Sequence, residues 1–341
     1  MRKVLVLSAA VAAACASAAV VSPGVEAAAA PAEPVGPTPT TTTQEPVSAT
    51  PEAPQEATKI TAGSQVETAQ AFIVTLPRLR TARYSYGPDA DQQIDAYLRS
   101  PAEGTQPAVL LLHGGSWLTG DKSSWRRVAH RLAADGYAVF SADYRLSGEA
   151  PWPAQRDDAE AALAFIKRHA ERFKVDPARV VVIGSSAGGQ LATMLGTYGA
   201  GAQKVSGVVA LSPVNSPYLA YLDGALPGAS STAVKLRGAV EQLIGCTPQE
   251  IDTTCWQRIE DVAPATHADR GDAPMLIMHS ADEFVPTAHS TELVAELKGY
   301  GVPVTLKEVP GTGHAMTIIK DPAAWRTLIT WIDSIAKKPA G

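Results

Sequence analysis

The sequence predicts an α/β fold, in which helices cover both faces of a mostly parallel central sheet. From residue 82 onward, short apolar runs alternate with segments of helical periodicity. Several of these runs are rich in β-branched residues and lack polar alternation, as expected for strands buried on both faces. The alternation is interrupted once, between residues 213 and 267, where Pro, Gly, Ser and Thr are frequent.

The elements follow one another in a regular order. Strands are expected over residues 82–86, 93–98, 108–112, 138–142, 180–183, 205–211, 275–278 and 304–309. Helices are expected over residues 123–134, 154–172, 188–195, 287–300 and 323–336. Right-handed crossovers would join these into a doubly wound sheet, which two antiparallel strands would lead. The insertion 213–267 follows the sixth strand, at the carboxyl edge where such sheets bind ligands, and is expected to form a lid or pocket wall.

Composition excludes several classes of protein. Of the 341 residues, 45% are apolar and 18% are charged, which excludes wholesale disorder and a coiled coil. The formal charge is −5 at pH 7, so there is no excess of basic side chains to neutralise phosphates. A dedicated nucleic-acid-binding protein and a protein that adheres to acidic lipids are therefore disfavoured.

Residues 1–30 have the pattern of a secretory signal peptide. Arg2 and Lys3 precede an apolar run of mostly small residues, and small residues suitable for cleavage follow a Ser-Pro-Gly break. The mature chain is therefore expected to be secreted, with no transmembrane span. A transmembrane anchor is the alternative for the apolar run, and Ala12-Ala-Ala-Cys15 leaves open a lipid anchor at Cys15.

A linker separates this leader from the globular domain. Residues 31–58 are rich in Pro and Thr and contain no aromatic residue. They cannot bury enough apolar area to offset the entropy of ordering, so a disordered linker is expected. The domain is expected over residues 59–341.

The domain contains two cysteines, Cys246 and Cys255, nine positions apart. In an oxidising compartment a local disulfide between them is expected. Two free thiols are the alternative. A metal site is disfavoured because no second Cys/His pair has zinc-like spacing.

Residues 180–192 predict a sharp turn that presents a nucleophile. A β-branched strand leads into Gly184-Ser-Ser186-Ala-Gly188 and then into a helix. Glycines on both sides of Ser186 would let strand and helix approach closely while its hydroxyl projects from the sheet edge. An ordinary Gly/Ser turn is the alternative, which the flanking strand and helix disfavour.

A second glycine turn follows the third predicted strand, in His113-Gly114-Gly115-Ser116-Trp117. Backbone N–H groups in such a turn can point inward and bind negative charge, which predicts Gly114 and Gly115 as oxyanion donors together with Ala187. His113 adjoins these donors and is expected to brace the loop.

A nucleophilic serine on such a turn needs a carboxylate and then a histidine later in the chain. His314 lies in a glycine turn after the last predicted strand and is the expected base. Asp282 lies just beyond the seventh predicted strand and is the expected carboxylate, with Glu283 as the main alternative. Other candidates are expected to be structural, solvated or at the opposite edge: His279, His289, Asp269 and Asp272.

Together with Gly120-Asp-Lys122, Ser141-Ala-Asp143-Tyr-Arg-Leu and Asp282-x-x-Val-Pro286, these motifs resemble the α/β-hydrolase superfamily over about residues 80–337. The resemblance is closest to hormone-sensitive-lipase-like carboxylesterases and to bacterial feruloyl- and acetyl-esterase-like proteins. It implies Ser186, Asp282 and His314 as the triad and Gly114, Gly115 and Ala187 as oxyanion donors. The sequence departs from the pattern at Ser116, where a third glycine is common, and lacks the N-terminal helical cap, which favours the capless esterases.

The expected function is a serine carboxylic-ester hydrolase. His314 would take the proton of Ser186, the acyl group would transfer to Ser186 and water would release it, with no metal or cofactor. An amidase or peptidase of the same fold, similar to arylformamidases or prolyl oligopeptidases, is the first alternative. A non-catalytic binding module is the second, although such modules typically lack a triad member.

The expected substrate is a small ester, including esters carried on polysaccharides, with a short acyl group. Trp117, Leu118 and Tyr218 are the expected substrate-binding residues, with Leu219 and Tyr221 as further wall candidates. A long acyl chain needs a continuous apolar groove. The Pro-, Gly-, Ser- and Thr-rich insertion supplies little of one.

Overall fold

The computed structural model describes residues 78–100, 104–249, 251 and 253–337. They belong to one compact unit that extends from Ala71 to Gly341. The expected signal peptide (1–30) and linker (31–58), and with them Cys15, lie outside the described residues.

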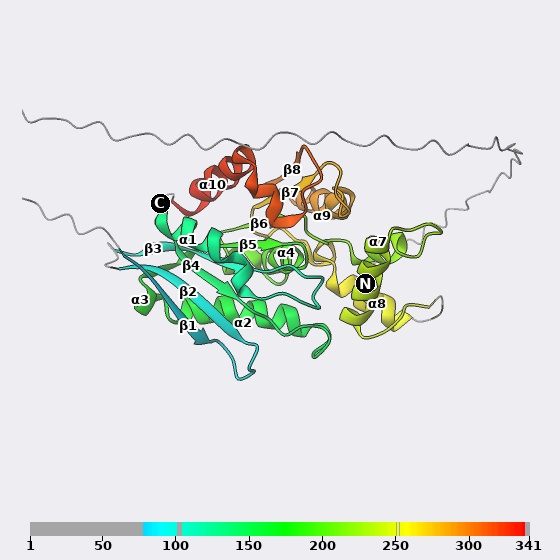
Figure 1. The fold of residues 1–341 in the computed structure, drawn as a ribbon, viewed down its shortest axis with the longest axis horizontal. Helices are drawn as coiled ribbons and strands as arrows, with labels where there is room; N and C mark the ends of the chain where they lie inside the picture. The colour runs from blue at the N-terminus through cyan, green and yellow to red at the C-terminus, as the bar shows by residue number, and fades with distance from the viewer. Residues whose placement is uncertain (1–77, 101–103, 250, 252, 338–341) are drawn as a thin grey trace, which may run out of the picture. The chain divides into compact units, whose positions relative to one another are not determined.

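A single eight-stranded sheet forms the centre of this unit, in the order β1-β2-β4-β3-β5-β6-β7-β8 (Figure 1). The strands are β1 (Arg78–Ser85), β2 (Gln93–Ser100), β3 (Gln106–Leu112), β4 (Ala138–Ala142), β5 (Val175–Ser185), β6 (Gly207–Leu211), β7 (Met275–Ser280) and β8 (Val304–Val309). β2 is antiparallel to both β1 and β4, and all later pairs are parallel. The predicted α/β sheet with two leading antiparallel strands is therefore confirmed.

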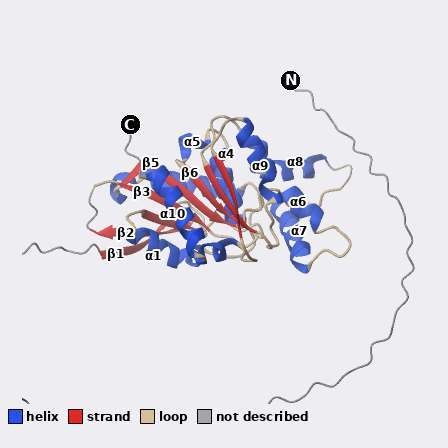
Figure 2. Cartoon of the chain, turned by 90° about the horizontal axis from the view of Figure 1, so that it is seen from above, coloured by secondary structure: helices blue, strands red, loops and turns tan. Residues whose placement is uncertain are grey.

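Helices cover both faces of the sheet (Figures 1 and 2). Alternate side chains of β3 point to opposite faces. Leu110 and Leu112 share one core with the helices α2 (Ala154–Arg168), α3 (Ala170–Phe173), α4 (Ala187–Thr197) and α9 (Ala288–Gly299). Val109 and Leu111 share the other with α1 (Arg126–Ala134) and α10 (Pro322–Ala336). Within the described ranges, none of the helices is long and apolar enough to cross a membrane.

The insertion 213–267 after β6 forms a small helical layer with its own core. It contains α6 (Pro217–Asp223), α7 (Ser231–Ile244), α8 (Thr253–Val262) and the short 3-10 helix η2 (Pro264–His267). Their apolar sides pack together and against Trp117 and Ala187. A disulfide joins Cys246 to Cys255, with 6.1 Å between the Cα atoms, as expected from the sequence. Both ribbon views place α7 and α8 beyond one end of the sheet (Figures 1 and 2).

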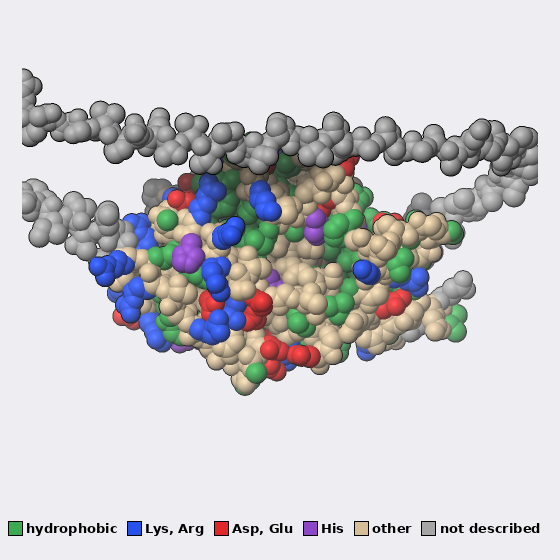
Figure 3. Space-filling model, in the orientation of Figure 1, with side chains coloured by type: hydrophobic (Ala, Val, Ile, Leu, Met, Phe, Trp, Pro, Cys, Tyr) green, Lys and Arg blue, Asp and Glu red, His purple; other side chains and the backbone are tan. Residues whose placement is uncertain are grey.

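Charged side chains are unevenly distributed over the face drawn in Figure 3. Lys and Arg side chains gather on the side of the molecule that carries β1, β2 and α1. On that side Arg80, Arg99, Arg172 and Lys174 line a cavity of about 410 Å³. Because Lys174 directly precedes β5, this cavity lies at the amino edge of the parallel strands, away from the residues that follow the strands.

Candidate active site

Ser186 occupies a sharp turn between β5 and α4. Its backbone has φ 53° and ψ −119°, which non-glycine residues rarely adopt, and its N–H donates to Leu211 O over 2.8 Å. A Cβ atom on Gly184 would lie 1.9 Å from Gly188 O, and one on Gly188 would lie 2.3 Å from His113 O. Positions 184 and 188 must therefore be glycine, because only glycine allows the close approach of strand and helix that the motif predicts.

The imidazole of His314 lies between a hydroxyl and a carboxylate. His314 Nδ1 lies 2.5 Å from Glu283 Oε2, and His314 Nε2 lies 3.0 Å from Ser186 Oγ. Because a carboxylate only accepts hydrogen bonds, the Nδ1 proton is donated to Glu283. Nε2 is then free to accept the proton of the Ser186 hydroxyl. The structure thus brings together Ser186 and His314, the two residues expected to be nucleophile and base.

The prediction that Asp282 is the carboxylate beside the histidine is wrong. The turn after β7 leaves the side chain of Asp282 exposed, and only its backbone reaches the histidine loop, where its N–H donates to Gly311 O over 3.0 Å. The next residue, Glu283, points inward and is buried. Its longer side chain reaches His314. Glu283, the alternative candidate from the sequence, is therefore the carboxylate that contacts the histidine.

Glu283 is held as a carboxylate by several donors. Its Oε1 accepts hydrogen bonds from Ser212 Oγ over 2.8 Å and from the N–H of Ser280 over 2.7 Å. The ring of His279 lies behind it, with Nδ1 3.6 Å from Oε1. Burial alone raises the pKa of Glu283, but the interactions with His279, His314, Ser212 and Ser280 outweigh burial and lower the pKa to about 2.

Ser212 joins the carboxylate to the histidine loop, a role that the sequence did not predict. Besides donating to Glu283, its Oγ accepts the N–H of Ala315 over 2.7 Å. Ser212 is fully buried and has φ 47°, and Ala315 has φ 56°. The only sequence signal for Ser212 is its place directly after a predicted strand.

The glycine loop after β3 lies against the serine. A Cβ atom on Gly114 would be 3.1 Å from Ser186 Cβ. Gly115 has φ 124°, and a Cβ atom there would lie 2.0 Å from Thr119 O, so no other residue fits. Ala187 is the first residue of α4, where a backbone N–H has no intrahelical acceptor. Of the three expected oxyanion donors, Gly114 therefore lies against Ser186 and Ala187 directly follows it, while Gly115 is the next residue of the Gly114 loop.

A set of buried contacts braces this loop from behind. The His113 ring stacks on Tyr144 with 4.3 Å between centroids, and the Tyr144 hydroxyl donates to His113 O over 2.9 Å. Burial lowers the pKa of His113, which favours the neutral ring. Lys122 and Asp143 form an ion pair, and the N–H of Lys122 also donates to Asp143 over 2.6 Å. His113 thus has the bracing position expected of it.

Of the three residues predicted to bind substrate, the prediction for Trp117 is wrong. Trp117 has φ 59°, so its ring turns into the core of the insertion and is fully buried. Its Nε1–H donates to Gln190 Oε1 over 3.1 Å, and Gln190 Nε2 donates to Val262 O over 2.7 Å. Trp117 therefore joins the oxyanion loop to α4 and to the insertion. Leu118 is half-buried, and Tyr218 is 51% exposed beside Trp256, so both stay candidates for contact with substrate.

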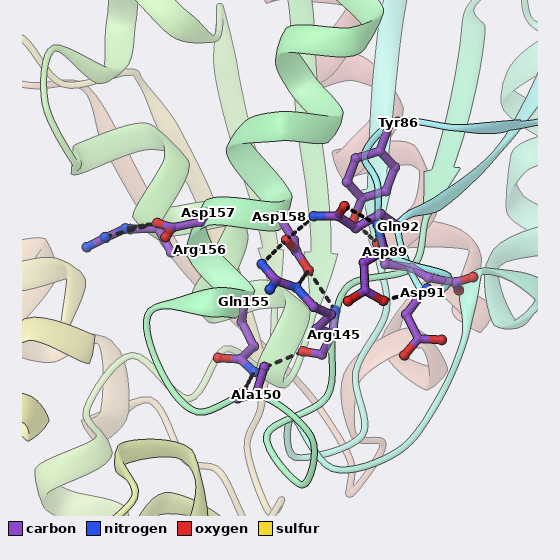
Figure 4. Close-up of polar contacts among 11 residues, drawn as sticks. Tyr86, Asp89, Asp91, Gln92, Arg145, Ala150, Gln155, Arg156, Asp157 and Asp158 are labelled. Atoms are coloured by element: carbon purple, nitrogen blue, oxygen red, sulfur yellow. Dashed lines mark hydrogen bonds and ion pairs between the residues drawn. The ribbon is translucent and has the colours of Figure 1, made fainter.

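A polar network around Arg145 and Asp158 fixes the segment after β4 (Figure 4). Asp158 is buried and accepts two hydrogen bonds from the Arg145 guanidinium, at 2.6 and 2.9 Å, and one from Gln92 Nε2 at 2.6 Å. This network fixes the start of a loop in which Ser147 donates from its N–H and its hydroxyl to Trp117 O. The loop therefore helps to fix the backbone of the oxyanion turn.

An exposed aromatic ring lies against His314, and the sequence did not predict it. The ring of Phe284 lies 4.2 Å from that of His314, centroid to centroid, yet Phe284 is 46% exposed. The signal available in the sequence is its place directly after Glu283.

The chain is similar to known esterases in sequence and to known α/β-hydrolases in fold. Esterase LipC of Mycobacterium tuberculosis is 26% identical over 256 residues, covering 70% of this chain and 60% of LipC. The chain thus spans less than two thirds of the length of that relative. Among solved structures, a truncated carbohydrate esterase from gut microbiota has a TM-score of 0.64 at 22% identity and covers 75% of this chain and 97% of that one.

A second solved structure is MGS-M1, an α/β-hydrolase enzyme from a deep-sea metagenome library. It has a TM-score of 0.56 at 20% identity, covering 76% of this chain and 99% of that one. At such identities the likeness shows the fold. The BD-FAE family matches residues 94–297, more than half of the chain. The chain therefore has the α/β-hydrolase fold and belongs to the BD-FAE family.

Proposed function

We propose that this protein is a serine carboxylic-ester hydrolase that works through an acyl-enzyme on Ser186. The observation that carries the proposal is the line of contacts from Ser186 Oγ through His314 to Glu283, at 3.0 and 2.5 Å. The esterase LipC supports an ester as the substrate.

In this proposal each group has a defined step. His314 Nε2 takes the proton of Ser186 as Oγ attacks the ester carbonyl, and Glu283 stabilises the resulting imidazolium. N–H groups of Gly114, Gly115 and Ala187 stabilise the developing oxyanion. His314 then gives its proton to the leaving alcohol, and a water molecule activated by the same imidazole releases the acid.

Ser186→Ala tests this assignment on soluble aryl acetates. We expect kcat to fall ~10³-fold or more, because the nucleophile is lost, while the thermal unfolding midpoint changes little. A phosphonate probe should label Ser186 and not its neighbour Ser185. Full activity in the variant, or labelling at Ser185, would rule out the assignment. For the wild-type protein, hydrolysis of a matched anilide as fast as the ester would favour the amidase alternative. Absence of turnover by the wild-type protein on both substrates would favour a binding module.

We further propose a preference for short acyl groups. The apolar side chains of the insertion mostly pack into its own core, and the hydroxyl of Tyr221 donates to Pro248 O over 3.0 Å rather than facing a groove. Five large apolar side chains of the insertion stay exposed, namely Tyr218, Leu222, Leu226, Val234 and Ile251, and a long acyl chain would need such side chains to form one continuous groove that leads to Ser186. The proposal is that they form no such groove. Rates on aryl esters from acetate to palmitate should be highest between acetate and butyrate. An optimum at ten carbons or longer would contradict this.

Export is also a proposal, supported by the pattern of residues 1–30 and by the disulfide between Cys246 and Cys255. Expression of the full chain in a secreting host should place the protein outside the cytoplasm, with an N-terminus after residue 27 or 29. A lipid-modified N-terminal Cys15 would instead identify a lipoprotein.

A further inference from the structure

Phe284 has an orientation that folding does not require. Its neighbours Glu283 and Val285 are both buried, whereas Phe284 is 46% exposed. Burying a Phe side chain stabilises a fold by about 1.5–3 kcal/mol, so a ring left half in solvent contributes less than it could. The ring is tilted by 39° against that of His314, and part of it stays accessible to solvent.

The position of the ring relative to the chemistry indicates which part of an ester it meets. During acylation the carbonyl oxygen must face the N–H groups of Gly114, Gly115 and Ala187, and the acyl carbon must bond to Ser186 Oγ. The leaving oxygen must lie within hydrogen-bond distance of His314 Nε2, since it receives its proton there. A ring whose centroid lies 4.2 Å from that of the imidazole is near enough to contact that alcohol.

We propose that Phe284 is a specificity-determining residue that binds the alcohol part of the ester and favours alcohols with a flat, ring-shaped face. The inference rests on the proposed esterase function. The π face of Phe carries partial negative charge and attracts weakly positive C–H groups and the edges of other rings. An aryl ring and the C–H face of a pyranose both present such groups, whereas a short linear alcohol does not.

Three acetate esters test the proposal, because they form the same acetyl-enzyme and differ only in the alcohol: phenyl acetate, a methyl pyranoside monoacetate and ethyl acetate. We expect Phe284→Ala to lower kcat/KM about tenfold for at least one of the two ring-bearing esters and less than about twofold for ethyl acetate. The two ring-bearing esters show whether the aryl or the pyranosyl face is the better ligand. Phe284→Trp should retain the preference, and Phe284→Leu, which is apolar but not flat, should lose it.

Deacylation separates specificity from support of the histidine. The alcohol has left by that stage, so hydrolysis of the acetyl-enzyme, measured after the burst on phenyl acetate, should be unchanged in Phe284→Ala. Ser334→Ala, an exposed position on α10 outside the site and the insertion, should leave all three rates unchanged. Equal losses on all three esters, slower deacylation, or no change on any ester would overturn the proposal. A wild-type protein that hydrolyses none of them would instead contradict the proposed esterase function.

Discussion

Glu283 Oε2 lies 2.5 Å from His314 Nδ1, while the side chain of the adjacent Asp282 is exposed to solvent. One position along the turn thus separates a carboxylate that orients an imidazole from one that does not. The other oxygen of Glu283 accepts hydrogen bonds from Ser212 and Ser280, so the carboxylate is fixed at both ends.

Glu283→Gln should lower kcat by about 10²–10⁴-fold on a soluble aryl ester. The amide has nearly the same shape, but it can present an N–H to His314 and so favour the wrong tautomer, and it cannot stabilise the imidazolium. Asp282→Asn is the matched control and should keep nearly full activity. If the Asp282 variant were the impaired one, the turn after β7 would have to adopt another conformation in solution.

The acid limb of the pH profile should report one proton. The interactions around Glu283 lower its pKa to about 2, so it stays ionised at every pH above about 3. Between pH 4 and the midpoint of the acid limb of the profile, a plot of log kcat/KM against pH should therefore have a slope of 1, because only the histidine base takes up a proton. A slope of 2 in this range would show that Glu283 also takes up a proton.

Ser212→Ala should weaken both stability and turnover. It removes one donor from Glu283 and leaves the N–H of the half-buried Ala315 without its acceptor, which costs about 1 kcal/mol in the free energy of unfolding. Because the loop that carries His314 is then less well fixed, kcat should fall roughly tenfold with KM unchanged. Ser334→Ala, on the distant helix α10, should affect neither quantity. A change in KM alone would indicate that Ser212 contacts the substrate instead.

The sheet and the serine turn could be predicted from the sequence because their signals are local. Buried strands give β-branched runs, and the close approach of β5 and α4 allows only glycine at 184 and 188. The choice between Asp282 and Glu283 depends on which way a turn projects its side chains, and spacing along the chain does not contain that information. The same applies to Trp117, whose positive φ turns the ring inward.

The helices of the insertion were not predicted either. Its Pro, Gly, Ser and Thr residues interrupt the alternation of strands and helices, yet α7 buries an apolar stripe at helical spacing, Leu236, Val240 and Leu243. That stripe needs a partner, and α6 and α8 supply it. The partner surface belongs to the two helices that flank α7 in the sequence, neither of which was predicted, so the periodicity of α7 alone was a weak indication.

Removing the disulfide should loosen the insertion more than the sheet. The bond between Cys246 and Cys255 ties the end of α7 to α8, and closing so short a loop contributes roughly 2–3 kcal/mol in the chain-entropy model. In Cys246→Ser/Cys255→Ser, amide exchange should accelerate in α7 and α8 and stay unchanged in β5. Intact mass of the exported protein should be two daltons below that of the reduced form. Equal acceleration in β5 would show that the insertion and the sheet unfold together.

Asp272 should make the protein less stable as the pH rises. It lies just before β7 and is buried, its Oδ2 accepts the N–H of Asp269 over 2.9 Å, and its Oδ1 has no hydrogen-bond partner among the described residues. Burial, reinforced by the charge of Asp269, raises the pKa of Asp272 to about 7, despite the opposing hydrogen bond from the Asp269 backbone. In the unfolded chain an Asp titrates near ~3.9. Between these two values the unfolded state releases a proton that the folded state keeps, so ionisation favours unfolding up to about pH 7.

Asp272→Asn removes this titration while keeping an oxygen that can accept the Asp269 N–H. At pH 8 the variant should have a free energy of unfolding higher than wild type by on the order of 1 kcal/mol, because a buried charge is lost. Near pH 4 the aspartic acid is protonated in the fold and nearly half so in the unfolded chain, and the two proteins should be almost equally stable. Urea unfolding at both pH values measures the difference. Asp135→Asn, on an exposed carboxylate, controls for net charge and should show no such pH dependence. A stabilisation of Asp272→Asn that is the same at pH 4 and pH 8 would mean that the carboxyl group does not titrate in this interval.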